Sequence, residues 1–166
     1  MGFERETTLA RFAAGYARSL AADLDDAALA DQPAPGVNHP AWILGHLAIA
    51  TDYARQLLGL PMACPQAWHA QFGPGSTPEP DRASYPTKAE LLGALEAGIA
   101  AVLEALPGAD PAALAQPHGV PIAFLKDAFP TRADLLAHLL TTHAAAHLGQ
   151  LSLWRRWKGL PGVLAL

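Results

Sequence analysis

Two histidines four residues apart are the residues of this sequence with the clearest chemical potential. His143 and His147 lie in a long stretch that the spacing of its apolar residues predicts to be a helix. Residues i and i+4 of a helix stack on one face, so two imidazoles at this spacing can share one metal ion. A third ligand would then have to come from another element of the fold.

His46 is the best candidate for that third ligand. It shares the apolar stripe of Ile43 and Leu47 on a second predicted helix, which should direct its side chain inward. Three buried imidazoles are costly when unpaired, and the predicted stripes offer no inward carboxylate that could pair with all three. A divalent metal would satisfy them together, and neutral imidazole suits zinc, nickel, copper or iron. The alternative is a chance i,i+4 pair among seven histidines.

Two further residues are predicted to line a pocket beside this site. Gln150 follows His143 by seven positions and should lie on the same face, where it could hydrogen-bond a metal-bound water or a substrate. Tyr53 follows His46 by the same interval. The alternative for Gln150 is an amide that packs between helices. No catalytic residue and no cofactor-binding residue is assigned from the sequence.

The remaining histidines are weaker candidates for the site. His138 is about 140° around a regular helix from His143, so it is predicted to face another way. His39 is predicted to be a helix cap or a surface residue. His69, in the connection after the second helix, is predicted to be a loop-surface residue, with an approach to the mouth of the site as the alternative.

The residues between the histidines limit the chemistry. The spacing from His143 to His147 matches that of the zincin helix, but Ala144 stands where a zincin has its glutamate base, which disfavours peptide hydrolysis. A ferritin-like di-iron site would need several inward glutamates. The remaining interpretation is a mononuclear three-histidine site with open positions, which could activate a bound thiol or water.

The elements that must position these residues are four predicted helices. Thr87 with Glu90 and Thr131 with Asp134 are typical capping pairs, and Pro40 is typical of a first helical turn. The long Pro- and Gly-rich connection over 60–86 could run the length of a bundle. We therefore predict a single all-α domain over 1–166, an up-down-down-up four-helix bundle with helices over about 4–24, 38–58, 87–106 and 131–158.

Composition restricts the partners. Half of the 166 residues are hydrophobic and the net charge is −4, which favours a globular domain and disfavours nucleic-acid binding. One cysteine, Cys64, and no apolar run long enough to span a bilayer indicate a cytoplasmic protein with no membrane partner. We expect a small-molecule substrate, and apolar outward residues of the first and third helices would permit a homodimer.

The two histidine segments together resemble a known family. Residues 38–47 (NHPAWILGHL) and 143–151 (HAAAHLGQL) look like the paired motifs of the DinB-like/YfiT-like metalloprotein superfamily. The resemblance implies an up-down-down-up four-helix bundle that holds a divalent metal, usually zinc or nickel, on His46, His143 and His147. Characterised relatives include S-transferases that depend on a low-molecular-weight thiol and a mycothiol-dependent maleylpyruvate isomerase. The three alanines between His143 and His147 depart from the acidic or aromatic residues of many members.

Three functions remain open from the sequence. The first is a metal-dependent enzyme that activates a small thiol for S-transfer or isomerisation. The second is a metal-dependent hydrolase that uses bound water, for which the sequence offers no evident base. The third is a non-catalytic metal-binding or stress-related dimer module, which would be favoured by a closed site with four protein ligands.

Overall fold

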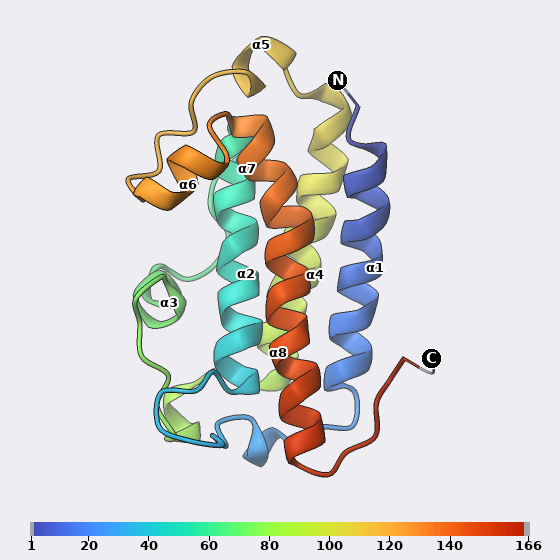
Figure 1. Cartoon of the computed structure of the whole chain (residues 1–166), viewed down its shortest axis with the longest axis vertical. Helices are drawn as coiled ribbons and strands as arrows, with labels where there is room; N and C mark the ends of the chain where they lie inside the picture. The colour runs from blue at the N-terminus through green and yellow to red at the C-terminus, as the bar shows by residue number, and fades with distance from the viewer. Residues whose placement is uncertain (1, 165–166) are drawn as a thin grey trace.

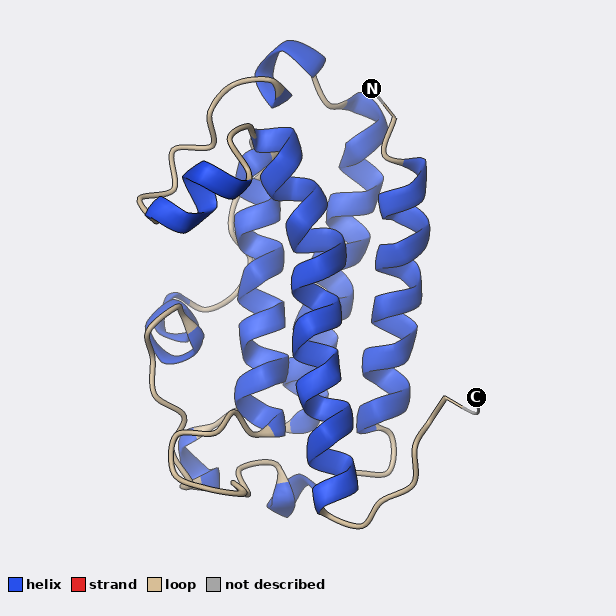
Figure 2. Cartoon of the chain, in the orientation of Figure 1, coloured by secondary structure: helices blue, strands red, loops and turns tan. Residues whose placement is uncertain are grey.

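The computed structural model describes residues 2–164, and these form helices joined by loops (Figure 1). The described residues contain no strand beyond one isolated antiparallel bridge, between Pro117 and Thr131 (Figure 2). Long helices lie side by side as a bundle: α1 (Glu4–Ala21), α2 (Pro40–Leu57), α4 (Lys88–Ala105), and a last segment made of α7 (Arg132–His138), a π-turn (Leu139–His143) and α8 (Ala144–Trp157). The predicted all-α class and helix-bundle packing are confirmed. None of the described helices is long and apolar enough to cross a membrane.

Shorter helices occupy the connections. They are α3 (Gln66–Phe72), α5 (Pro111–Leu114) and α6 (Ala123–Ala128), with 3₁₀ turns at Asp26–Ala28, Arg82–Ser84 and Leu106–Gly108. The sequence did not predict α6, because no side chain caps its first turn and none of its residues is buried. It therefore lacks both the start signal and the apolar stripe on which a sequence prediction depends.

Side-chain caps fix where the main helices begin. Thr87 and Glu90 form a capping box at the start of α4, and Thr131 and Asp134 form one at the start of α7. His39 caps α2, because its Nδ1 accepts a hydrogen bond from the backbone of Trp42. His39 is therefore a cap as predicted, but its side chain is fully buried and does not lie on the surface.

The four bundle members pack in a ring in which α1 and α2 each contact α4 and α8. Helices α2 and α4 approach closely at Gly98, where an added Cβ would lie 1.9 Å from the hydroxyl of Thr51. The segment over 58–87, with α3, covers the remaining face of α2 (Figure 1). As a result α2 is buried nearly all round, from its first residue to its last.

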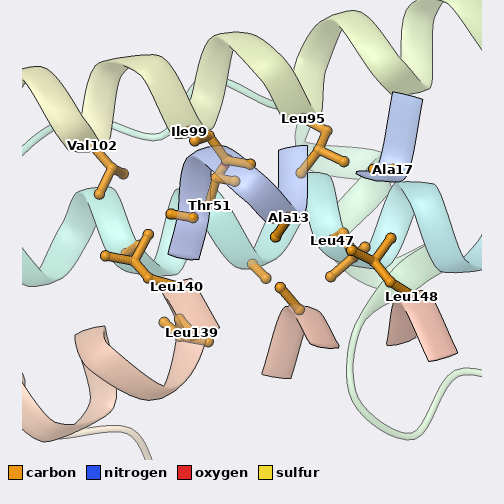
Figure 3. Close-up of a pocket in the computed structure, with 14 residues that line it drawn as sticks. Ala13, Ala17, Leu47, Thr51, Leu95, Ile99, Val102, Leu139, Leu140 and Leu148 are labelled. Atoms are coloured by element: carbon orange, nitrogen blue, oxygen red, sulfur yellow. The ribbon is translucent and has the colours of Figure 1, made fainter. Parts of the chain in front are cut away.

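A small apolar cavity lies in the core between α1, α2, α4 and the last segment (Figure 3). Its volume is about 30 Å³, and Ala13, Thr51, Ile99 and Leu139 are among the residues that line it. A cavity of this size holds little more than one water molecule, and an apolar lining disfavours even that. It is too small for an organic substrate.

Candidate metal centre

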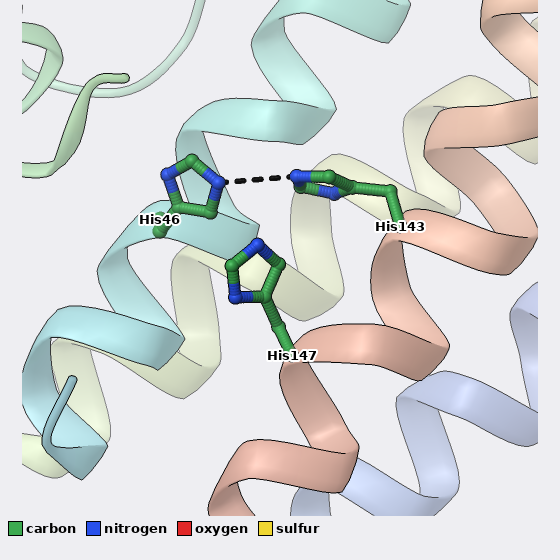
Figure 4. A group of neighbouring side chains, drawn as sticks. All are labelled: His46, His143 and His147. Carbon is green, nitrogen blue, oxygen red and sulfur yellow. Dashed lines mark hydrogen bonds between the residues drawn. The ribbon is translucent and has the colours of Figure 1, made fainter. Parts of the chain in front are cut away.

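Three histidines from two sides of the bundle meet at one point (Figure 4). His46 comes from α2, His143 from the last position of the π-turn and His147 from the first turn of α8. One ring nitrogen of each lies within 4.8 Å of the other two, and the Nε2 atoms of His46 and His143 are 3.1 Å apart. The structure thus brings together the three residues selected from the sequence, and no carboxylate among the described residues joins the cluster.

The spacing of these nitrogens fits a metal ion. Two nitrogens bound to one zinc at 2.0–2.1 Å with tetrahedral angles lie about 3.3 Å apart. The Nε2 atoms of His46 and His143 are already near that distance, and the nitrogen that His147 contributes lies within 4.8 Å of both. The cluster could therefore hold one divalent ion with coordination positions left for other ligands.

The orientation of His46 is set by a backbone carbonyl. Its Nδ1 lies 2.6 Å from the carbonyl oxygen of Phe72, which can only accept, so Nδ1 carries the hydrogen. That leaves the lone pair of Nε2 directed at the other two histidines. The ring is also stacked on Trp42 at a centroid distance of 4.6 Å. Gly45 makes room for Phe72, since a Cβ there would lie 2.5 Å from its ring.

The orientation of His147 is set by Gln150. The Nδ1 of His147 lies 3.1 Å from Oε1 of Gln150, and Asn38 donates to the same oxygen at 3.0 Å. Gln150 was expected on the inward face beside the metal, but its side chain is exposed and its oxygen is occupied by His147 and Asn38. Its contact is with a candidate ligand, in the way that outer residues orient histidines in metal sites.

His143 has different surroundings. Its Nδ1 is buried and has no hydrogen-bond partner among the described residues. The ring of His138 lies 5.6 Å away in an edge-on arrangement, so the prediction that His138 faces elsewhere was wrong. The cause is the π-turn: its hydrogen bonds join residues five apart, so positions 138 and 143 come onto the same side of the helix.

Burial keeps all three imidazoles neutral at physiological pH. Desolvation lowers the pKa of His46 to about 4 and that of His143 to about 3, and the neighbouring histidines add to the effect. The pKa of His147 is also lowered by desolvation, against the opposing effect of its bond to Gln150. Neutral imidazole is the form that binds a metal, so the unshared electron pairs are available without loss of a proton.

The structure places two other predicted or possible site residues away from the cluster. Tyr53 is half-buried, and its ring lies 5.7 Å from that of His69. His69 belongs to α3 and lies 3.0 Å from the carboxylate of Asp52, so it is neither a surface residue nor a member of the cluster. Cys64 lies beside the same carboxylate; burial, with Asp52, raises the pKa of its thiol to about 12, which leaves it unreactive at neutral pH.

Sequence reasoning missed Asp52 and Phe72. Asp52 is a fully buried carboxylate on α2, a helix on whose stripe no inward carboxylate was expected. Because α2 is buried nearly all round, the period of its apolar residues cannot show which polar residues point inward. Phe72 acts through its backbone carbonyl, for which a sequence gives no signal.

The fold and the cluster define a helix-bundle protein with a candidate three-histidine metal site. The family model of the DinB superfamily matches residues 10–151, a span that includes all three histidines, and the chain belongs to this superfamily. The resemblance seen in the two histidine segments is therefore confirmed. Neither a curated protein nor a solved structure matches the chain.

Proposed function

We propose that this protein is a metal-dependent enzyme that activates a small thiol for S-transfer or isomerisation, with His46, His143 and His147 as the metal ligands. The single observation that carries the proposal is the convergence of three neutral imidazoles in a cluster without a carboxylate among the described residues. A divalent ion held there, zinc or nickel, would supply a Lewis acid that lowers the pKa of a bound thiol.

The reaction class follows from the groups that surround the cluster. A thiol has an intrinsic pKa near 8.5 and needs little help to ionise, whereas water needs a base or a stronger shift. No carboxylate lies in the cluster to act as that base, which favours a thiol over water as the nucleophile. In S-transfer the thiolate sulfur forms a bond to an electrophilic carbon, the leaving group departs with its electron pair, and the thiol proton passes to solvent.

The protein's own residues position the ligands and the substrate. Phe72 and Gln150 orient two of the three imidazoles. Burial of the imidazole rings keeps them unprotonated. The oxygen of Gln150 is taken by His147 and Asn38, so its exposed amide nitrogen is the group that can donate to a small-molecule substrate. Tyr53 would then act in packing α3 and not in the reaction.

The first experiment is metal analysis of the purified protein and of two variants. We expect one equivalent of divalent metal in the wild type and in His118→Ala, whose histidine lies in a loop outside the cluster, and little in His46→Ala. Thiol consumption is then measured with cysteine, glutathione and mycothiol against a panel of electrophiles. Equal metal in all three proteins would refute the site, and turnover of esters but not of thiols would favour the hydrolase.

We also infer the up-down-down-up connectivity of the bundle. At one end, Arg155 of α8 donates to the carbonyl of Leu20 in α1. At the same end, the backbone of Lys88, the first residue of α4, donates to Asp26, just beyond α1. These contacts support α1 parallel to α8 and antiparallel to α4, with the long segment over 58–87 returning the chain between α2 and α4 (Figure 1).

A further inference from the structure

Asp52 is a buried carboxylate that the proposed function does not use. It is 0% exposed in the last third of α2, and its oxygens have three close partners. The backbone nitrogens of Ala63 and Cys64 donate to it at 2.8 and 2.9 Å, and Nε2 of His69 does so at 3.0 Å. All three partners belong to the single segment over 63–69, which leads into α3 and forms its first turn.

A buried carboxylate is destabilising unless its hydrogen bonds are satisfied, so these contacts hold the segment firmly against α2. Arg55, the nearest cation, reaches Asp52 only at 4.0 Å and donates instead to the carbonyl of Pro61. His69 therefore joins the α3 helix itself to Asp52, while the thiol of Cys64 lies beside the same carboxylate. Loss of the His69 donor would leave no hydrogen bond from within α3 to Asp52.

Helix α3 contacts the candidate ligand His46 one turn after His69. Phe72 follows His69 by three residues, is 0% exposed and gives its carbonyl to Nδ1 of His46. Its ring packs on Gly45 of α2. The end of α3 is tightly closed, because a Cβ at Gly73 would lie 2.3 Å from the carbonyl oxygen of His69. α3 is thus attached to α2 at two places, one of which orients His46.

We propose that Asp52 is a positioning residue for the metal centre: through His69 it seats α3 so that the Phe72 carbonyl holds the Nδ1 hydrogen of His46 and directs Nε2 at the other two histidines. Asp52 does not touch the metal or the substrate. This inference rests on the proposed metal site. It adds two successive contacts behind the ligand His46: the carbonyl of Phe72, which binds His46, and the Asp52–His69 pair, which holds the helix of Phe72.

The test compares His69→Leu with His69→Gln. Leucine removes the donor to Asp52, whereas the glutamine amide restores it. Residues that hydrogen-bond metal ligands typically contribute 10–100-fold to metal affinity. Because Asp52 acts on His46 only through α3, we expect the lower end of this range: zinc binding about tenfold weaker in His69→Leu, and near that of the wild type in His69→Gln. The second readout needs no metal: the tautomer of His46, from ¹⁵N shifts of its ring, should be a single Nδ1–H form in wild type and His69→Gln, and mixed in His69→Leu.

Two further proteins separate positioning from general stability. Leu114→Ala removes a buried side chain in α5, beyond α7, and should lower the melting temperature without changing zinc affinity. Asp52→Asn removes the carboxylate and should weaken zinc binding as His69→Leu does. If only one of these two variants folds, that variant is the test. Unchanged zinc affinity and an unchanged His46 tautomer in the folded variant would overturn the inference, as would an equal loss of zinc affinity in Leu114→Ala. If His46→Ala binds zinc like the wild type, the metal site itself is wrong.

Discussion

The substitution Gly45→Ala tests how closely the fold of α2 is coupled to the metal centre. A Cβ at this position would lie 2.5 Å from two atoms of the Phe72 ring and 2.6 Å from a third. Carbon atoms in contact prefer about 3.5–4.0 Å, so the ring would have to move by about 1 Å. Because Phe72 is fully buried, the ring cannot turn into solvent, and the displacement must carry the end of α3 with it.

Two consequences can be given magnitudes. Overpacking of this kind costs about 1–3 kcal/mol, and the better helix propensity of alanine returns about 0.5–1 kcal/mol. We expect a net loss of up to about 2.5 kcal/mol, which for a domain of this size lowers Tm by up to about 10 °C. A shift of about 1 Å would lengthen the 2.6 Å bond from His46 to the Phe72 carbonyl past the hydrogen-bond limit, and zinc affinity should fall about 10–100-fold.

The assay is thermal unfolding by circular dichroism together with zinc competition titration. Gly93→Ala in α4 is the matched control, because a Cβ there meets nothing within 4 Å and the change should stabilise the protein by about 0.5–1 kcal/mol. If Gly45→Ala raised Tm as Gly93→Ala does and left zinc affinity unchanged, Phe72 would not be the element that orients His46.

Two more predictions concern the cluster. Replacement of Gln150 by leucine keeps the size of the side chain but removes the acceptor for His147, so zinc affinity should fall about tenfold. The Tm without zinc should change by no more than about 1 °C, because surface substitutions usually have small effects on stability. An unchanged zinc affinity in competition titration would show that Gln150 does not orient His147. Because the folded pKa values of His46 and His143 are about 4 and 3, below the unfolded value near 6.5, the unfolded chain binds more protons between these limits. The free energy of unfolding, measured in the presence of a metal chelator, should therefore be constant above pH 6.5 and fall as the pH drops from 6.5 toward 4. The dependence on pH should be weaker in His46→Phe. If urea titrations of the wild type and His46→Phe gave the same dependence on pH, the lowered pKa of His46 would be contradicted.

The sequence alone determined the main helices and the choice of ligands. Helix starts are local, since the capping pairs at Thr87 and Thr131 and the His39-Pro40 start are made within one turn of chain. The i,i+4 spacing of His143 and His147 is likewise local. His46 could be added because its stripe was apolar, and an apolar stripe on a helix must face a core.

The tertiary structure decided what lies around those ligands. The period of apolar residues assumes regular α-helix, so it could not place His138, which a π-turn brings next to His143. It also assumes that a helix has an outer face, so it could not find Asp52 on a helix that α3 and the following segment cover.

The orienting groups show the same division. The acceptor for His46 is the backbone carbonyl of Phe72, which every residue type could provide, so only the path of α3 across α2 selects it. The oxygen of Gln150 is directed to His147 by geometry that its type alone does not fix. Residue types and local spacing thus name the atoms that can bind a metal, while the hydrogen bonds that aim them depend on contacts between segments distant in the chain.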